Sequence, residues 1–424
     1  MKIAVLGPIA TRDIAPLLES TSELPEGYTG APLVTTLIRE LLRRDHDVVA
    51  VTTDMRAGLP RGRPAMARGH RLKYYVCSSR RRAYRPNGWR PGRILDLYRD
   101  ERAEILRVLA FERPDVVHAH WSYEFGWAAV DSGLPHLVTC HDSPWQVLRH
   151  LPNAYRLGRL LMARRVLGRA RRMTTVSDYM REELKGFAGV VAEVVPNPVD
   201  SVEGVRPREL LTGAGISSPF RIGMVLNGWG GRKNGPNGLE AFRRARERLP
   251  RAELHLFGFG CGPKEAAQRW ASKKCADGVV FHGAVEHERM LKEMVAFDIL
   301  LHPAREESFG MVIVEAQIRG VPVIGGRASG AVPWLLERGS SGILVDVESP
   351  EEMANSICAL SADPSRYAQL SRAGLRSAHL RFTVGAVVDS FEEIYDDLLR
   401  FPAGDASRQA DSLFVRNLSV SGSD

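Results

Sequence analysis

Short apolar segments alternate with amphipathic helical segments along nearly the whole of the 424-residue chain. Because parallel strands need a helical crossover between them, this alternation predicts parallel β-sheets with helices on both faces. The strands expected in the first half are residues 2–6, 47–53, 72–77, 115–118, 136–140, 173–176 and 190–195. Those expected in the second half are residues 221–226, 252–257, 278–283, 297–302, 321–324 and 342–345. The chain is longer than one hydrophobic core usually serves, so we predict two α/β domains.

The alternation is interrupted between the halves, where Pro196 and Pro198 favour an extended connection. We place the domain hinge there. Apolar periodicity then persists to a last helix, whereas the final segment is polar and lacks periodicity, which predicts disorder. The expected N-terminal domain, C-terminal domain, last helix and disordered tail comprise residues 1–198, 199–380, 381–400 and 401–424.

Composition indicates an ordinary globular protein, with 44% hydrophobic and 25% charged residues. The first residues resemble a β-strand rather than a signal peptide, and no segment approaches the ~20 apolar residues that a membrane span requires. We therefore expect a cytoplasmic protein. The five cysteines are scattered without a C-x-x-C pair, which favours ordinary thiols over disulfides or a zinc site: Cys77, Cys140, Cys261, Cys275 and Cys358.

The net charge of +8 is concentrated in two stretches that contain no acidic residue. Residues 56–93 hold twelve Lys or Arg, and residues 149–172 hold eight Arg interleaved with leucines in a basic amphipathic pattern. Two interpretations stay open: a solvated arginine-rich surface, or contact with an anionic membrane or an anionic acceptor. Nucleic acid is disfavoured because no aromatic series or helix-turn-helix pattern is present to read bases.

The most informative motif follows the expected strand 297–302, which Pro303 closes. Glu307 lies on the loop at the carboxyl end of that strand, and Glu315 lies about two turns into the expected helix 309–319. Between them, the first backbone N–H groups of the helix form a site that attracts anions, most often phosphate. Two carboxylates on either side of a phosphate site suit a ligand with hydroxyls on both sides of a phosphate, such as a nucleotide-sugar.

The motif resembles that of glycosyltransferase family 4. Residues 307–310 (Glu-Ser-Phe-Gly), Glu315 with Ala316, and residues 320–324 (Gly-Val-Pro-Val-Ile) carry the resemblance, which is densest over residues 221–345 and weaker over residues 1–200. It implies the GT-B architecture: two Rossmann-like α/β domains facing each other across a cleft, with a C-terminal helix returning toward the N-terminal domain. It also implies a retaining enzyme, of hexosyltransferase type, that moves a sugar from a nucleotide-diphosphate-sugar to a hydroxyl acceptor.

The resemblance further implies that neither a metal nor a cofactor is required, and that the acceptor belongs to polysaccharide or lipid-linked glycan assembly, or is a small molecule. Glu307 would contact the donor sugar as a catalytic residue, and Glu315 would accept hydrogen bonds from the ribose hydroxyls. An ionised carboxylate accepts only, so it suits vicinal hydroxyl donors. The amides that follow Phe309 would bind the distal phosphate, at Gly310, Met311 and Val312.

Donor contacts are also expected from segments outside the motif. Lys233 matches the lysine that binds the diphosphate in relatives, but Asn227 stands where they usually carry an arginine, and Arg232 is a candidate replacement. Gly30 lies in a loop that in relatives approaches the donor phosphates. The glycines of residues 258–262 have the spacing G-x-G-x-G, which departs from a dinucleotide fingerprint and argues against a dehydrogenase.

On the acceptor side, His141 follows the strand 136–140, where relatives place a catalytic histidine beside the donor sugar and acceptor. Asp142 and His120 are acceptor-side candidates. His118 and His120 share one face of a strand, but no third ligand is evident for a metal site. Two other functions stay open: a nucleotide-sugar 2-epimerase of the same fold, and a non-catalytic protein that binds sugar nucleotides beside a true transferase.

Overall fold

A computed structural model describes residues 1–28, 30–55, 59–210, 219–273 and 277–401. The tail predicted to be disordered, residues 402–424, lies outside these ranges, as do Cys275 and residues 56–58 of the first basic stretch. The chain divides into two compact units. The first contains Met1–Cys140, Asn153–Thr174 and the residues from Val388 onward, and the second contains His141–Pro152 and Thr175–Val387. The domain boundaries expected at residues 198 and 380 stay predictions.

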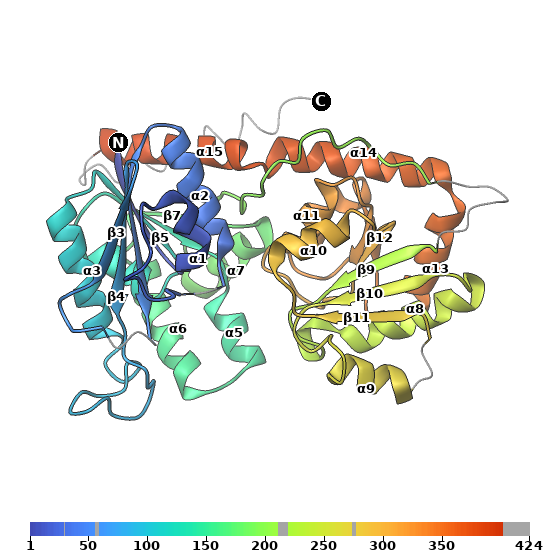
Figure 1. Cartoon of the computed structure of the whole chain (residues 1–424), viewed down its shortest axis with the longest axis horizontal. Coiled ribbons are helices and arrows are strands. Elements are labelled where there is room, and N and C mark those ends of the chain that lie inside the picture. Colours follow the sequence, from blue (N-terminus) through green and yellow to red (C-terminus); the bar gives the residue numbers. More distant parts are fainter. Residues whose placement is uncertain (29, 56–58, 211–218, 274–276, 402–424) are drawn as a thin grey trace. The chain divides into compact units, whose positions relative to one another are not determined.

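The N-terminal sheet has eight strands in the order β3-β4-β2-β1-β5-β6-β7-β8. Four of them, β3, β4, β5 and β7, are labelled in Figure 1. In chain order they are β1 (Lys2–Leu6), β2 (Asp47–Asp54), β3 (Ala65–Gly69), β4 (Leu72–Ser78), β5 (Val116–His120), β6 (His136–Cys140), β7 (Arg172–Thr175) and β8 (Glu193–Val194). β1 lies in the centre, paired in parallel with β2 and β5, and its apolar run from Ile3 to Leu6 is fully buried. A strand buried on both faces by flanking helices reads as such an unbroken apolar run.

Two strand predictions need correction in this sheet. The strand expected at residues 190–195 shortens to β8, and β3 was not predicted. β3 pairs antiparallel with β4 at the edge of the sheet, and its residues are not buried, so it lacks the apolar run that marks the other strands. The helices of this half are α1 (Thr11–Ile14), α2 (Pro32–Arg43), α3 (Arg99–Glu112), α4 (Glu124–Asp131), α5 (Pro144–His150), α6 (Ala154–Leu167) and α7 (Asp178–Ala188).

The second unit contains a six-stranded parallel sheet in the order β11-β10-β9-β12-β13-β14. Its strands are β9 (Arg221–Val225), β10 (Glu253–Phe257), β11 (Val279–Gly283), β12 (Ile299–His302), β13 (Val323–Gly326) and β14 (Ile343–Val345). Its helices are α8 (Gly235–Arg248), α9 (Ala266–Lys273), α10 (His287–Met294), α11 (Met311–Gln317), α12 (Val332–Leu335), α13 (Pro350–Ala362) and α14 (Pro364–Arg381). The strand order brings β9 beside β12, so that the segments following these two strands start from neighbouring points at one edge. The prediction of parallel α/β sheets is confirmed.

The last helix, α15 (Val384–Arg400), begins three residues later than the expected range 381–400 and ends at the expected residue. From Val388 onward it belongs to the first unit, in agreement with the predicted return of the C-terminal helix. There the hydroxyl of the buried Tyr395 lies 2.6 Å from His118 Nδ1, and Arg44 donates to Asp389 and Glu392 at 2.6 and 2.5 Å. Within the described ranges, no helix has both the length and the apolar character that crossing a bilayer demands.

Candidate functional site

The loop between β12 and α11 holds Glu307 in a fixed, buried position, with 7% of the residue exposed. The carbonyl of Glu307 accepts a hydrogen bond from the N–H of Ala331 at 2.9 Å. The carbonyl of the next residue, Ser308, accepts one at 2.6 Å from the hydroxyl of Ser177, which also caps the N-terminus of α7. These backbone contacts hold the loop from both sides and leave the carboxylate of Glu307 to be positioned by its own neighbours.

Two basic side chains surround that carboxylate. Lys233 Nζ donates to Glu307 Oε1, and His302 Nε2 lies 3.2 Å from the same oxygen. Burial raises the pKa of Glu307, but hydrogen bonding to His302 and the charge of Lys233 outweigh it and lower the pKa to about 2. Glu307 is therefore ionised at neutral pH, inside the protein, as an acceptor of hydrogen bonds.

Lys233 reaches Glu307 from the segment that follows β9. The 3₁₀ turn Gly231–Lys233 ends at Asn234, which adopts a left-handed conformation (φ 55°) and donates to the carbonyl of Val347 at 2.9 Å. The N–H of Arg305 bonds to the carbonyl of Arg232 at 2.8 Å and ties this turn to the loop that carries Glu307. Adjacent side chains consequently diverge. Lys233 points to Glu307, whereas the exposed Arg232 donates to the carbonyl of Glu306 at 3.3 Å.

α11 begins at Met311, two residues later than predicted, because Gly310 is left-handed (φ 102°) and cannot be part of the helix. The first N–H groups of a helix have no acceptor within it, so those of Met311 and Val312 are available to a ligand. Both residues are partly exposed. Phe309, by contrast, is buried with its ring edge-on to Trp334 and Phe382, and serves to anchor the turn.

Glu315 lies in the second turn of α11 and is also buried, at 6% exposed. Its Oε1 is 2.7 Å from Nε2 of His287, the first residue of α10. The hydrogen bond to Glu315 raises the pKa of His287, against the opposing effect of burial. His287 is the residue that holds the Glu315 carboxylate, and nothing in the local sequence pattern predicted this role.

The raised pKa of His287 can be tested by titration. By NMR, we expect the imidazole to titrate above the usual value of about 6.5, and to return toward that value in the Glu315→Gln variant. A raised pKa means that this pair stabilises the fold fully below about pH 6.5 and loses the contribution as pH rises through the folded-state pKa. The His287 side chain is 47% exposed, so solvent screening limits the contribution to about 1 kcal/mol or less. An unchanged titration in Glu315→Gln would contradict the pairing.

The remaining candidates divide between the two units. Gly30 (φ 114°, exposed) and His120 lie in the first unit, where His120 is buried at the carboxyl end of β5 and stacks on His118 with ring centroids 4.4 Å apart. His141 and Asp142 belong to the second unit and follow β6. The His141 side chain is hydrogen-bonded to Asn197, and burial lowers its pKa to about 3, so it is neutral at physiological pH.

The structure therefore brings Lys233 and Glu307 into contact and places Glu315 one helix turn beyond the first N–H groups of α11. It adds His302 and His287 as partners of the two carboxylates. Sequence reasoning missed both histidines. His302 is the last residue of the buried strand β12, and its position at the carboxyl edge of the sheet could have marked it as a site residue. No comparable sequence feature marks His287. In the described part of the chain, no cluster of three or more His, Cys, Asp or Glu side chains could hold a metal.

Comparison with known proteins identifies the family and the fold. The family model described as Glycosyltransferase Family 4 matches residues 31–203, and that of Glycosyl transferases group 1 matches residues 221–363. The D-inositol 3-phosphate glycosyltransferase of Stackebrandtia nassauensis is 26% identical over 328 residues, which cover 70% of this chain and 72% of that protein.

Solved structures share the fold over almost the whole length. Sucrose-phosphate synthase from Thermosynechococcus elongatus superposes with a TM-score of 0.70 at 18% identity, covering 94% of this chain and 99% of the other. The HepE protein of Anabaena, solved in complex with UDP-glucose, gives 0.64 at 19% identity, covering 94% and 100%. The fold and these relatives together show an enzyme of the GT-B glycosyltransferase class. The chain belongs to glycosyltransferase family 4, as its two domain matches and its motif indicate.

Proposed function

We propose that this glycosyltransferase takes its sugar from a nucleotide-diphosphate-sugar and transfers it to a hydroxyl acceptor with retention of anomeric configuration. The observation that carries the proposal is the buried, ionised Glu307, paired with Lys233 and followed directly by the N-terminus of α11. A carboxylate and a row of backbone donors in one short segment, with a cation brought to them from the segment after β9, match the diphosphate and the sugar hydroxyls of such a donor. For Glu315, eight residues on, we propose that its carboxylate accepts hydrogen bonds from the ribose hydroxyls.

In the proposed mechanism, the bond between the anomeric carbon and the phosphate oxygen breaks while the acceptor oxygen attacks from the same face. The departing phosphate takes the proton of the acceptor hydroxyl. Lys233 and the amides of Met311 and Val312 stabilise the negative charge that accumulates on the diphosphate. An ammonium group has three donors, so Lys233 can hold Glu307 and a phosphate oxygen together. Glu307 orients the donor sugar and stabilises the positive charge that develops at its anomeric carbon.

Donor binding is testable with a thermal-shift panel of nucleoside diphosphates and their sugars. A ligand present at one hundred times its Kd should stabilise the protein by about 2.7 kcal/mol, and the ranking of the panel identifies base and sugar. In Glu315→Ala, we expect calorimetry to show nucleotide affinity roughly tenfold or more lower, because ribose hydroxyls lose a charged acceptor worth about 1.5–3 kcal/mol. Glu337→Ala, at a carboxylate away from the loop of Glu307, is the matched control. Unchanged affinity in Glu315→Ala would refute the ribose role.

Two incubations separate this proposal from the alternatives. A 2-epimerase would release an isomerised sugar nucleotide when no acceptor is present, whereas a transferase needs an acceptor for turnover. A non-catalytic sugar-nucleotide-binding protein would show the thermal shift but no product, even with a cell extract supplying glycans, lipid-linked glycans and small hydroxyl compounds. The buried pair of Lys233 and Glu307 supports the transferase, because fixed charges in a buried site suit the charge that develops during sugar transfer.

We further propose that the enzyme makes peripheral contact with an anionic membrane. The two acid-free basic stretches support it, but several of their arginines turn inward. Arg80 and Arg93 are buried at 5% and 9% exposed, and Arg159 lies over the ring of Tyr123 with its guanidinium carbon 3.6 Å from the centroid. The basic amphipathic reading of residues 149–172 therefore needs correction at Arg159, because this side chain is directed to α4 rather than to solvent. The arginines of the two stretches that stay exposed therefore cover a smaller surface than the sequence indicated.

A further inference from the structure

The connection between β4 and α3 carries the most exposed large hydrophobic side chain among the described residues. Trp89 is 89% exposed, and Tyr84 and Leu95 of the same connection are 46% and 65% exposed. We call residues 81–95 the Trp89 loop. Tryptophan is usually well buried in folded proteins, so an indole that is almost entirely in water at the end of a loop indicates a surface that acquires a partner.

Internal hydrogen bonds fix the conformation of the Trp89 loop. The N–H of Asn87 donates to the carbonyl of Arg90 at 2.8 Å, and Gly88 takes the left-handed conformation (φ 67°) that such a tight turn requires. The Asn87 side-chain NH₂ lies within hydrogen-bond distance of three carbonyls of the loop and shares its two N–H donors among them: those of Arg82 (3.1 Å), Arg85 (3.3 Å) and Pro91 (3.3 Å). Asn87 thereby closes the loop and holds Trp89 at its tip.

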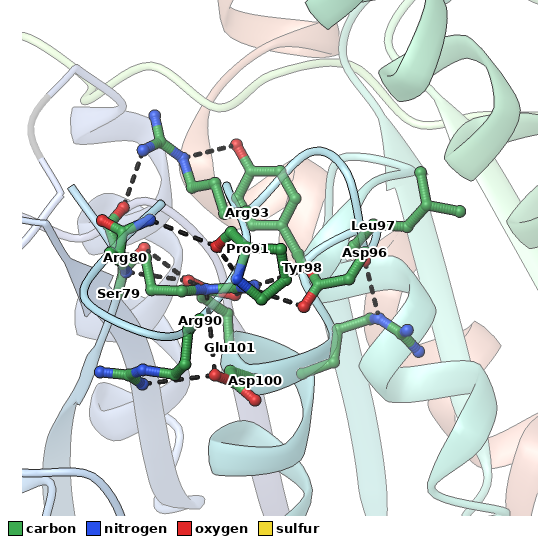
Figure 2. Close-up of polar contacts among 12 residues, drawn as sticks. Ser79, Arg80, Arg90, Pro91, Arg93, Asp96, Leu97, Tyr98, Asp100 and Glu101 are labelled. Atoms are coloured by element: carbon green, nitrogen blue, oxygen red, sulfur yellow. Dashed lines mark hydrogen bonds and ion pairs between the residues drawn. The ribbon is translucent and has the colours of Figure 1, made fainter. Parts of the chain in front are cut away.

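The base of the loop is fixed by a buried charged network, which Figure 2 shows around Arg80. Arg80 donates to both oxygens of Asp96 at 2.7 and 2.8 Å and to Glu101 at 2.7 and 3.1 Å. Arg93 donates to the carbonyls of Arg80 and Arg81 at 2.7 and 2.5 Å and to the hydroxyl of Tyr98 at 3.1 Å. The base of the loop is thus held by buried hydrogen bonds, and these contacts occupy the side chains of Arg80 and Arg93.

The arginines that remain face outward. The Trp89 loop holds five arginines and no acidic residue. Arg93 is buried, and Arg90 lies 3.3 Å from Asp100. Arg82 and Arg85 are exposed, and the guanidinium of Arg82 contacts the carbonyl of Pro86, which carries no net charge to offset its own. An indole at the tip and guanidinium groups behind it therefore occupy the same small surface.

We propose that the Trp89 loop docks this enzyme on the surface of an anionic lipid bilayer. Indole and phenol rings prefer the level of the lipid headgroups, and arginines close to an anionic leaflet are attracted by about 1 kcal/mol each. A nucleic acid would need a series of stacking rings or a groove-reading element, and the loop has a single tip residue. The proposal rests on the peripheral membrane contact proposed above and names the surface that makes it; because this surface belongs to the first unit, its test is separate from that of the donor site on the second unit.

The test is co-sedimentation of the full chain with phosphatidylcholine vesicles that contain or lack phosphatidylserine. We expect binding only to the anionic vesicles, weakened by salt because screening shortens the range of the attraction. Arg82→Gln with Arg85→Gln should lower the partition coefficient roughly 25-fold, at about fivefold for each charge lost. Trp89→Ser should lower it several-fold without changing net charge.

Matched controls separate this surface from net charge and general stickiness. Arg372→Gln with Arg376→Gln removes two exposed arginines of α14, and Phe111→Ser removes a ring that is 76% exposed on α3. Both should bind vesicles like the wild type. Equal losses in loop and control variants, equal binding to neutral vesicles, or no binding at all would overturn the proposal, as would sedimentation abolished by added RNA. Circular dichroism and nucleotide-induced thermal shifts should be unchanged in the loop variants, which keeps this test distinct from that of donor binding.

Discussion

Glu307→Gln should lower sugar transfer by roughly 10²–10³-fold or more while the protein stays folded. Glutamine keeps the shape of the side chain but removes the charge that Lys233 and His302 hold in place. The ionised carboxylate is a strong acceptor for sugar hydroxyls and stabilises positive charge at the anomeric carbon; an amide does neither as well. Because the loss concerns the transition state, turnover should fall far more than nucleotide affinity.

The measurement is the initial rate of nucleoside diphosphate release with donor and acceptor, together with nucleotide binding by calorimetry. Glu306→Gln is a well-matched control. Its carboxylate is adjacent in sequence but contacts His150 Nε2 at 2.9 Å and the hydroxyl of Tyr179 at 3.3 Å, away from Lys233. We expect this variant to keep its rate within a few-fold. Near-normal turnover in Glu307→Gln would remove Glu307 from the mechanism.

Arg80→Ala should produce the largest loss of stability, about 3–5 kcal/mol. The Arg80 and Glu101 side chains are 2% and 1% exposed, and the substitution leaves Glu101 as a buried charge without its principal partner. It also removes the bidentate contact to Asp96, which fixes the start of α3 relative to the end of β4 (Figure 2). Breaking a buried pair by removing one member costs far more than the pair itself contributes.

The free energy of unfolding should be followed with a denaturant and probes in each unit, since a chain of two units need not unfold in one transition. Arg90→Ala serves as control, because its pair with Asp100 is 31% and 18% exposed and should contribute about 1 kcal/mol or less. We expect the transition of the first unit to move to lower denaturant while nucleotide binding at the second unit persists. A shift no larger than that of Arg90→Ala would show that the network is dispensable.

Most strands could be predicted because each is a local apolar run, buried on both faces, such as β1 or β12. β3 could not, because an edge strand with partly exposed residues has no such run. The basic stretches were overinterpreted for a related reason. A count of charges contains no information on partners, and Arg80 finds its partners Asp96 and Glu101 sixteen and twenty-one residues further along the chain.

Amino-acid order alone was sufficient to locate the loop of Glu307 and to place Glu315 on the helix that follows it, because these relations are short-range and follow from helix geometry. The helix start was predicted two residues too early, because the left-handed Gly310 delays it to Met311. Amino-acid order was also sufficient for the family. Folding decided the rest. Lys233 and Glu307 are 74 residues apart and meet only because β9 pairs with β12, and the carboxylate of Glu315 meets His287 from a separate helix. The charge state of Glu307 and the pKa of His287 depend on burial and on these partners, which arise only when distant segments pack together.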